Sequence, residues 1–308
     1  MVIHTTGPFQ SQNYRVAEAA IARRCHYADL ADARAFVCGI GALDTPARGA
    51  DVLVVSGASS VPCLTAAVVD DALPRFQLLE RMDYGITAAQ QTNRGLATAS
   101  AVLSYVGKQF TTLRDGRWTR VYGWQGLHAK QYPQLGLRLF GYCDIPDLDI
   151  FPRRYPTLRT MRFGAGHEIK LLHLSTWLLS WLVRIGVIHS LAPHAETLLR
   201  WSFLFDALGT STSGFHAEFC GLGHDGKSRR ERFYMIARSG HGPLIPCMPA
   251  ILLARRFARN QLTERGARAC LDLIDLEEYL NALAGLDIAV LRKMPGVAWP
   301  LSSAKGRA

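Results

Sequence analysis

The 308-residue sequence lacks most of the short patterns that identify a catalytic or metal-binding chain. Its seven cysteines are scattered without a C-x-x-C pair, which excludes a disulfide framework and the common zinc sites. His167-Glu168 has no second histidine at the spacing of a metalloprotease helix, and the serine loop at 56–60 has no G-x-S-x-G pattern. No signal peptide is recognisable, so a reducing cytoplasm is the expected compartment. Because no ligand spacing typical of a metal site occurs, no bound metal is expected.

Long hydrophobic runs are nearly absent, and the most apolar window covers residues 171–188. Its length approaches that of a spanning helix, but it contains His173 and Arg184 and follows Lys170, and charge inside a bilayer is costly. The window therefore predicts a helix packed on the sheet of its own domain, with membrane-surface attachment and a true membrane span as the alternatives. The core is also expected to hold three tryptophans that fall among apolar residues at helical spacing: Trp177, Trp181 and Trp201.

No glycine-rich phosphate-binding turn follows the first predicted strand, although the pattern G-x-G-x-x-G occurs at Gly221, Gly223 and Gly226. That motif binds phosphate only between a strand and a helix. Here alternating apolar residues flank Asp225-Gly226 on both sides, which is typical of a β-hairpin. The motif is therefore a decoy.

Acidic residues are relatively scarce in the later part of the chain. Residues 1–75 carry a net charge of −1, whereas residues 76–308 carry +11. The basic surplus indicates either an ordinary solvated surface or contact with an anionic substrate or membrane surface. No nucleic-acid partner is expected.

The first 70 residues alternate apolar strands with amphipathic helices. Strands are predicted at 2–4, 25–28 and 52–55, and helices near 16–21, 33–40 and from Pro62 onward. This order predicts parallel strands joined by right-handed crossovers. The first strand has the apolar character of a strand covered on both sides, so the chain is expected to start inside a fold.

The later region predicts an antiparallel or mixed sheet covered by helices. A second Asp-Gly hairpin is expected around Asp115-Gly116, and a long loop or lid over 123–156. Further elements are a strand at 81–88, a helix at 95–106, a strand at 159–163, helices at 169–188, 193–208 and 249–258, and a helix capped by Asp275 that runs to Leu283.

The segments "VIHTTGPFQSQNYRVAEAAIARRCHYADLADARAFV" and "LVVSGASSVPCLTAAVVD" resemble the second half of the nucleotide-binding domain of saccharopine dehydrogenase-like oxidoreductases. The resemblance implies an NAD- or NADP-dependent enzyme. It places the loop at 5–9 near the nicotinamide and the later strand ends on the rim of the same crevice, where open α/β sheets bind ligands. The implied cofactor-binding residues are Thr5, Thr6, Gly7, Pro8, Phe9, Asp29, Ser56 and Gly57.

The resemblance is incomplete, because neither the glycine-rich turn nor the ribose-binding residue of a dinucleotide fold is present. We therefore expect an N-terminally truncated Rossmann-like domain. Asp29 has two open interpretations, a helix cap or a crevice residue. The acids Asp144, Asp147 and Asp149 are interpreted either as an acid-base or hard-metal site or as a plain acidic turn.

Together these patterns predict an α/β fold with the second half of a doubly wound parallel sheet at 1–75. An α+β substrate or dimerisation domain is expected at 76–245, and C-terminal helices that pack back on the first domain at 246–308, with a frayed tail from 302. The expected function is an oxidoreductase acting on a small, anionic or polar molecule, inactive in this form if truncated, with a homodimer as one assembly. The alternative is a noncatalytic membrane-associated or scaffolding protein. The catalytic residues stay unassigned.

Overall fold

The structure is a computed structural model that describes residues 1–92 and 94–293, and the chain forms two compact units. Unit 1 comprises residues 1–71, 145–150 and 244–284, and unit 2 comprises 72–144, 151–243 and the described chain from 285. The expected C-terminal block is thus divided between the two, because residues 285–293 belong to unit 2. The frayed tail expected from 302 lies outside the described residues.

Sheet A of unit 1 is a parallel sheet with the strand order β1-β2-β3-β12. Ile3 lies opposite Ala28, Ala28 opposite Val55, and Val54 opposite Ala267. This arrangement confirms the predicted Rossmann-like sheet. The strands are β1 (Val2–His4), β2 (Tyr27–Asp29), β3 (Leu53–Ser56) and β12 (Gly266–Ala269).

The expectation that the first strand is covered on both sides is wrong. Among the described strands β1 pairs only with β2, and 42% of Ile3 is exposed. The strands that are buried along their whole length are β2 and β3, which lie inside the sheet. Position within the sheet, rather than apolar character, decides the burial.

Helices of unit 1 bury small apolar faces. Ala17, Ala20 and Ile21 of the first helix pack in one cluster with Val52 and Val54. The predicted cap of the last helix is confirmed, since the Asp275 side chain accepts the Glu278 backbone N–H at 2.8 Å. The helices are α1 (Arg15–Ala22), α2 (Arg34–Gly39), α3 (Asp44–Gly49), α4 (Thr65–Ala72), α9 (Met248–Ala258) and α10 (Leu276–Ala282).

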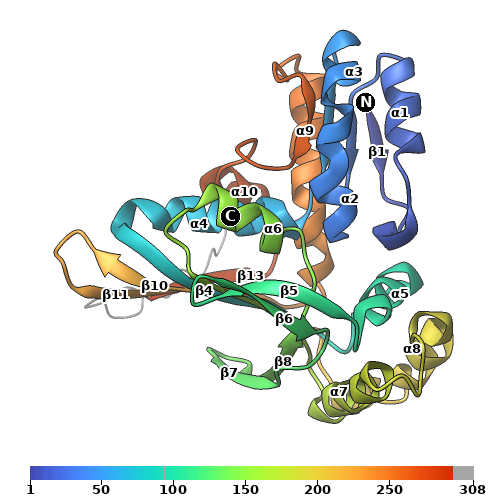
Figure 1. The fold of residues 1–308 in the computed structure, drawn as a ribbon, viewed down its shortest axis with the longest axis vertical. Coiled ribbons are helices and arrows are strands. Elements are labelled where there is room, and N and C mark those ends of the chain that lie inside the picture. The colour runs from blue at the N-terminus through green and yellow to red at the C-terminus, as the bar shows by residue number, and fades with distance from the viewer. Residues whose placement is uncertain (93, 294–308) are drawn as a thin grey trace. The chain divides into compact units, whose positions relative to one another are not determined.

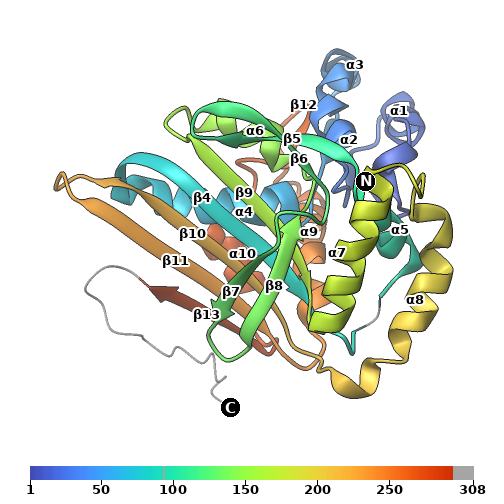
Figure 2. The same ribbon diagram turned by 60° about the horizontal axis from the view of Figure 1, so that its bottom comes forward.

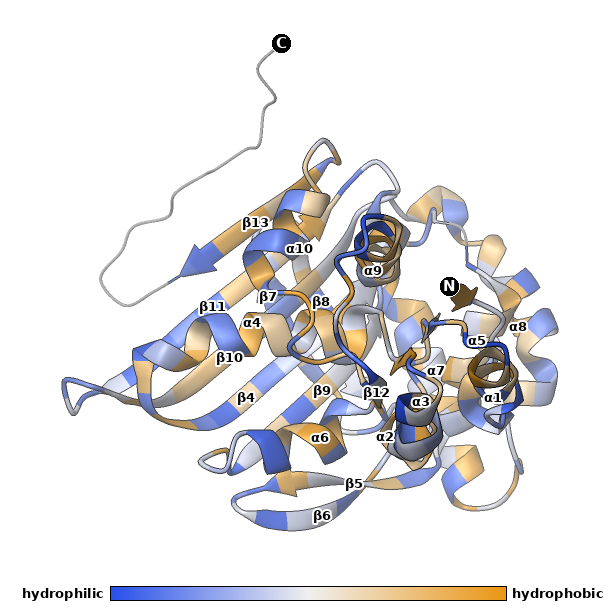
Figure 3. Ribbon diagram, turned by 90° about the horizontal axis from the view of Figure 1, so that it is seen from above, coloured by the Kyte–Doolittle hydropathy of each residue, from blue (hydrophilic) through white to orange (hydrophobic). Residues whose placement is uncertain are grey.

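Unit 2 is built on sheet B, whose order is β13-β11-β10-β4-β9-β8-β7 (Figures 1 and 2). Only the β4–β9 pair is parallel among its described neighbours, so the sheet is mixed as predicted. Hydrophobic and hydrophilic residues alternate along parts of β4 and β10, whereas β11 is hydrophilic over its first half and mostly hydrophobic over its second (Figure 3). The strands are β4 (Phe76–Ala88), β7 (His128–Tyr132), β8 (Gly136–Tyr142), β9 (Thr160–His167), β10 (Ser213–Gly223), β11 (Ser228–Ala237) and β13 (Ile288–Lys293).

Both Asp-Gly hairpins are confirmed. β5 (Gln109–Arg114) and β6 (Arg117–Tyr122) flank Asp115-Gly116, and β10 and β11 flank Asp225-Gly226. The G-x-G-x-x-G letters therefore lie in a hairpin, as expected. The long loop or lid predicted at 123–156 is wrong: it contains the β7–β8 hairpin and helix α6 (Asp147–Arg154).

Three further helices belong to unit 2: α5 (Leu96–Tyr105), α7 (Lys170–Arg184) and α8 (Ala195–Phe203). Val183 and the half-buried Trp177 pack in a cluster with Trp124. The prediction of a tryptophan core is wrong for the other two, since Trp181 is 38% and Trp201 is 63% exposed. Within the described chain, no helix combines the length and apolarity that crossing a bilayer requires.

Candidate functional site

The carboxyl ends of the parallel strands of sheet A form the candidate site. β1 ends at His4, β2 at Asp29 and β3 at Ser56, and the three strands are parallel neighbours. Their following loops therefore meet at one edge of the sheet, where open α/β folds bind ligands.

Asp29 joins two of these loops. Its Oδ1 accepts hydrogen bonds from the Ala31 N–H at 3.0 Å, the Gly57 N–H at 2.8 Å and the Ser56 hydroxyl at 2.9 Å. Burial raises the pKa of this carboxyl, and the three donors oppose that rise. Asp29 thus fastens the loop after β2 to the loop after β3.

The interpretation of Asp29 as a helix cap is wrong. Helix α2 begins at Arg34, its cap residue is Ala33, and no side chain caps it. Asp29 is fully buried at the strand end, in the position that the crevice interpretation required. Its contact with a ligand stays a prediction.

His4 and Tyr27 form a polar pair beside Asp29. The His4 Nδ1 and the Tyr27 hydroxyl are 2.9 Å apart, and the His4 ring packs edge-on against Phe9 at 5.0 Å. Burial raises the pKa of Tyr27, and the charge of Asp29 adds to the rise. Sequence reasoning missed this pair, because it depends on β1 and β2 being neighbours in register.

The loop after β1 presents the accessible part of the site. Thr5 and Thr6 are exposed and Gly7 and Pro8 are half-buried, whereas Phe9 packs against Phe36 at 5.3 Å. The Gln12 side-chain amide donates to the carbonyl oxygens of Thr6 at 2.6 Å and Pro8 at 3.1 Å. The Gln12 side chain therefore holds the backbone of this loop in place.

The loop after β3 is buried and tightly packed. Gly57 has a φ of +74°, and a Cβ there would lie 2.6 Å from the Pro62 Cδ. Ser56 and Gly57 are buried, so they contribute to the site by hydrogen bonding to the Asp29 carboxylate. Of the predicted set, Thr5 and Thr6 are exposed, and Gly7 and Pro8 are half-buried.

The strand-end edge presents the hydroxyls of Thr5 and Thr6 but lacks a glycine-rich turn for a pyrophosphate. A pyrophosphate needs free backbone N–H groups on a glycine-rich turn at a helix start. The connection from β1 to α1 has no such turn. The Arg15 N–H at the start of α1 already donates to the Asn13 side-chain oxygen at 3.3 Å.

Unit 2 contains an ionic cluster of two carboxylates and four cations, formed by Asp83, Glu218, Lys130, Arg162, Arg230 and Arg232. Arg162 donates to Asp83 through two nitrogens at 2.9 and 2.8 Å, and the Lys130 Nζ lies 2.7 Å from Asp83. Glu218 accepts from Arg232 at 2.7 Å and from Arg230. Burial would raise the pKa of Asp83, but Arg162 and Lys130 hold it well below its usual range.

Histidines lie next to this cluster in a nonpolar setting. The Tyr132 hydroxyl and the His216 Nδ1 are 2.6 Å apart. Burial lowers the pKa of His216 to about 3 against the opposing charge of Asp83, and burial also lowers the pKa of His128. Both rings are therefore neutral at physiological pH.

Two acidic residues of the segment 144–149, Asp147 and Asp149, have structural roles. Asp149 forms a bidentate pair with Arg34, at 2.7 Å to Nε and 2.5 Å to Nη2, and Asp147 is fully buried in the first turn of α6. Among the residues that the structure describes, no three acids, histidines or cysteines are grouped as a metal site. The hard-metal interpretation finds no support there.

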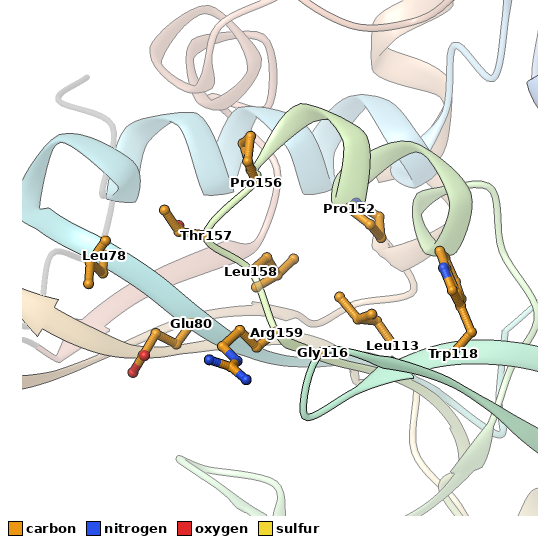
Figure 4. A pocket seen from close by; sticks show the side chains of 10 residues that line it. All are labelled: Leu78, Glu80, Leu113, Gly116, Trp118, Pro152, Pro156, Thr157, Leu158 and Arg159. Atoms are coloured by element: carbon orange, nitrogen blue, oxygen red, sulfur yellow. The ribbon is translucent and has the colours of Figure 1, made fainter.

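A hollow of about 520 Å³ lies in unit 2 (Figure 4). Its charged lining residues, Glu80 and Arg159, are exposed, and Trp118 is 53% exposed. The hollow therefore lacks the convergent buried polar groups of a reactive site. Its lining is Leu78, Glu80, Leu113, Gly116, Trp118, Pro152, Pro156, Thr157, Leu158 and Arg159.

The fold and the strand-end site define a class, a two-unit α/β protein with a saccharopine dehydrogenase-like fold. Among solved structures the chain is similar to apo histidine-tagged saccharopine dehydrogenase (L-Glu forming) from Saccharomyces cerevisiae. The TM-score is 0.58 at 11% identity, over 92% of this chain and 82% of that chain. No protein-family model matches the sequence, and no curated protein matches it.

Proposed function

We propose that the protein is an NAD(P)-dependent oxidoreductase of the saccharopine dehydrogenase-like type. The observation that carries the proposal is the joined strand-end edge, in which buried Asp29 fixes the loop after β3 beside the accessible Thr5 and Thr6. In this fold class such an edge receives the nicotinamide end of the cofactor. The bound nicotinamide supplies hydride transfer, and the chain supplies position and surroundings.

Each part of the edge has a separate role in this proposal. Thr5 and Thr6 present hydroxyl and backbone groups to the ribose. Asp29 holds Gly57 close, and the buried His4–Tyr27 pair joins the carboxyl end of β1 to the first residue of β2. Buried hydrogen bonds set the positions of Asp29, Gly57, His4 and Tyr27, which favours a rigid, preformed support for the loop after β1.

The substrate is proposed to be a small anionic or polar molecule. In the ionic cluster four cations face two carboxylates, and the side chains of Arg162 and Arg230 are 37% and 57% exposed. Guanidinium groups in that state have donors left for a carboxylate or phosphate. The positive charge of residues 76–308 adds a general attraction for anions.

A direct test is a binding titration of NADH, NADPH and reduced nicotinamide mononucleotide. Because the chain lacks the pyrophosphate turn, we expect the mononucleotide to bind about as tightly as the dinucleotides, with all dissociation constants well above the micromolar range. A low-micromolar dissociation constant for NADPH, about −8 kcal/mol, would contradict the proposal that the chain binds only the nicotinamide end of the cofactor. No binding of any of the three compounds would favour the noncatalytic alternative.

The variant Gly7→Val tests where binding occurs. A β-branched side chain just beyond β1 would point into ligand space, so mononucleotide binding should fall while the far-UV spectrum stays unchanged. Gly49→Val is the matched control in unit 1, because a Cβ at Gly49 meets nothing within 4 Å. Equal affinities in both variants would refute the placement.

A further inference from the structure

Helix α7 carries an exposed apolar stripe. Its members recur at intervals of three and four residues, so they occupy one helical face. Their exposed fractions run from 38% to 66%. The α7 stripe consists of Leu171, Leu174, Leu178, Trp181 and Ile185.

The opposite face of α7 is unusually polar for a buried face. His173 and Ser180 are fully buried there, beside Val183. A helix in water normally turns its leucines inward and its polar residues outward. Helix α7 thus buries two polar residues and Val183, half-buries Trp177 and Leu179, and leaves a row of large apolar residues exposed. An exposed apolar surface of this kind marks an interaction site.

Further exposed apolar residues follow α7 in the chain, in the connection to α8, in α8 and just after it. Figures 1 and 2 show α7 and α8 side by side in unit 2. Val187 in the connection is 69% exposed, and Trp201, Leu204 and Leu208 are 63%, 79% and 75% exposed. Aromatic and leucine side chains of this kind favour the boundary between headgroups and acyl chains.

The charge around the stripe has one sign. No acidic residue occurs between Glu168 and Glu196, whereas exposed Lys170 and Arg184 stand at the two ends of α7. Arg184 also lies over the Trp181 ring, with its guanidinium carbon 4.8 Å from the centroid. Cations at the ends of an apolar helical face complement an anionic lipid surface.

The same charges disfavour pairing with a second copy. In a two-fold antiparallel pairing of α7 helices, Lys170 would face Arg184 of the other copy, and in a parallel pairing each cation would face its own kind. Like charges placed opposite one another destabilise an interface. A lipid surface imposes no such conflict.

We propose that unit 2 docks peripherally on an anionic phospholipid bilayer through the α7 stripe. The helix, about 22 Å long at 1.5 Å per residue, lies in the interface plane with its leucines and Trp181 inserted. Lys170 and Arg184 stay at headgroup level. This adds a location to the proposed oxidoreductase and does not depend on that activity.

Vesicle sedimentation tests the proposal with the full chain. Vesicles of phosphatidylcholine containing about 30 mol% phosphatidylserine should bind the protein, and pure phosphatidylcholine vesicles should bind it at least about fivefold less. Leu178→Asp should weaken binding at least about tenfold, and Lys170→Gln about fivefold. Leu137→Asp is the matched control and should bind like wild type, since Leu137 is 43% exposed in unit 2 but lies on β8.

Tryptophan fluorescence supplies a second measurement. Brominated lipids should quench the wild-type protein more than Trp181→Phe, because Trp181 is placed in the lipid. The proposal is overturned if wild type ignores anionic vesicles, or if Leu178→Asp and Leu137→Asp bind equally. It is also overturned if the wild-type protein is a dimer that does not bind vesicles and Leu178→Asp converts that dimer to monomers. Nicotinamide binding measured without vesicles tests the oxidoreductase proposal separately.

Discussion

Two buried histidines of unit 2 should make the protein sensitive to mild acid. His173 and His216 are 0% and 1% exposed. Burial lowers the pKa of each to about 3. An unfolded histidine titrates near pH 6.5, so between about pH 6.5 and 3 the unfolded chain binds protons that the folded unit refuses. Stability is therefore complete above pH 6.5 and falls as the pH drops.

The size of the effect follows from linkage. Each histidine costs about 1.2 kcal/mol between pH 7 and 5.5, so the pair costs about 2.5 kcal/mol. His167, whose pKa burial lowers to about 4, adds about 1.2 kcal/mol more. The depressed pKa of Asp83 does not contribute in this window, because its stabilisation is lost only below about pH 4. Asp29 in unit 1 has the opposite sign, since its pKa is raised and protonation favours its folded state.

Urea unfolding at pH 7 and pH 5.5, at constant ionic strength, measures this difference. His173→Met should shrink the pH-dependent loss by about a third, from roughly 3.7 to roughly 2.5 kcal/mol, whatever it does to stability at pH 7. Leu191→Ala is the control, because this buried residue of the same unit should lower stability equally at both pH values. An unchanged pH difference in His173→Met, or none in wild type, would refute the reasoning.

Three further substitutions test other contacts. Asp83→Asn should cost about 3 kcal/mol of unfolding free energy at pH 7, because it leaves Arg162 without its anion and Lys130 with only Glu218, at 3.5 Å; urea titration measures this. Gly57→Ala should cost about 2 kcal/mol or more, since φ is +74° and the Cβ would lie 2.6 Å from Pro62, and an unchanged melting temperature would exclude the packing described. Asp275→Ala should cost about 1 kcal/mol and accelerate hydrogen exchange in α10, with slow exchange counting against the cap.

Features set by neighbouring residues could be predicted from the sequence. Both Asp-Gly hairpins and the Asp275 cap depend on a few adjacent residues, and the structure has all three. The alternation of strands and helices in unit 1 was also predictable, because each buried strand is a short apolar run. The identity of the strand ends at Asp29 and Ser56 followed from the same pattern.

Features set by distant partners could not be predicted in this way. β12 contains only Gly266, Ala267, Arg268 and Ala269, and it is a strand because it pairs with β3 more than 200 residues earlier. The β7–β8 hairpin was mistaken for a loop because its glycine, proline and tyrosine content resembles one. The helical period of α7 was correct, but a period does not say which face turns toward the protein.

The candidate site divides along the same line. The contacts of Asp29 with Ser56 and Gly57 follow from strand ends meeting at one edge. The His4–Tyr27 pair and the ionic cluster require the registers of β1 with β2 and of β4 with β9 and β10, which no local pattern contains. The ligand-binding roles of the predicted residues stay predictions.

The connectivity of the two units has a consequence for synthesis on the ribosome. The chain passes between units five times, and sheet A receives its last strand, β12, only from residues 266–269. Strand β3 therefore leaves the exit tunnel with one hydrogen-bonding edge unfilled and keeps it so while nearly all of unit 2 is translated. At about 5–20 residues per second this interval lasts on the order of 10–40 s. During that time the nascent chain carries an open parallel edge, and an unpaired strand edge of this kind is prone to pairing with other chains.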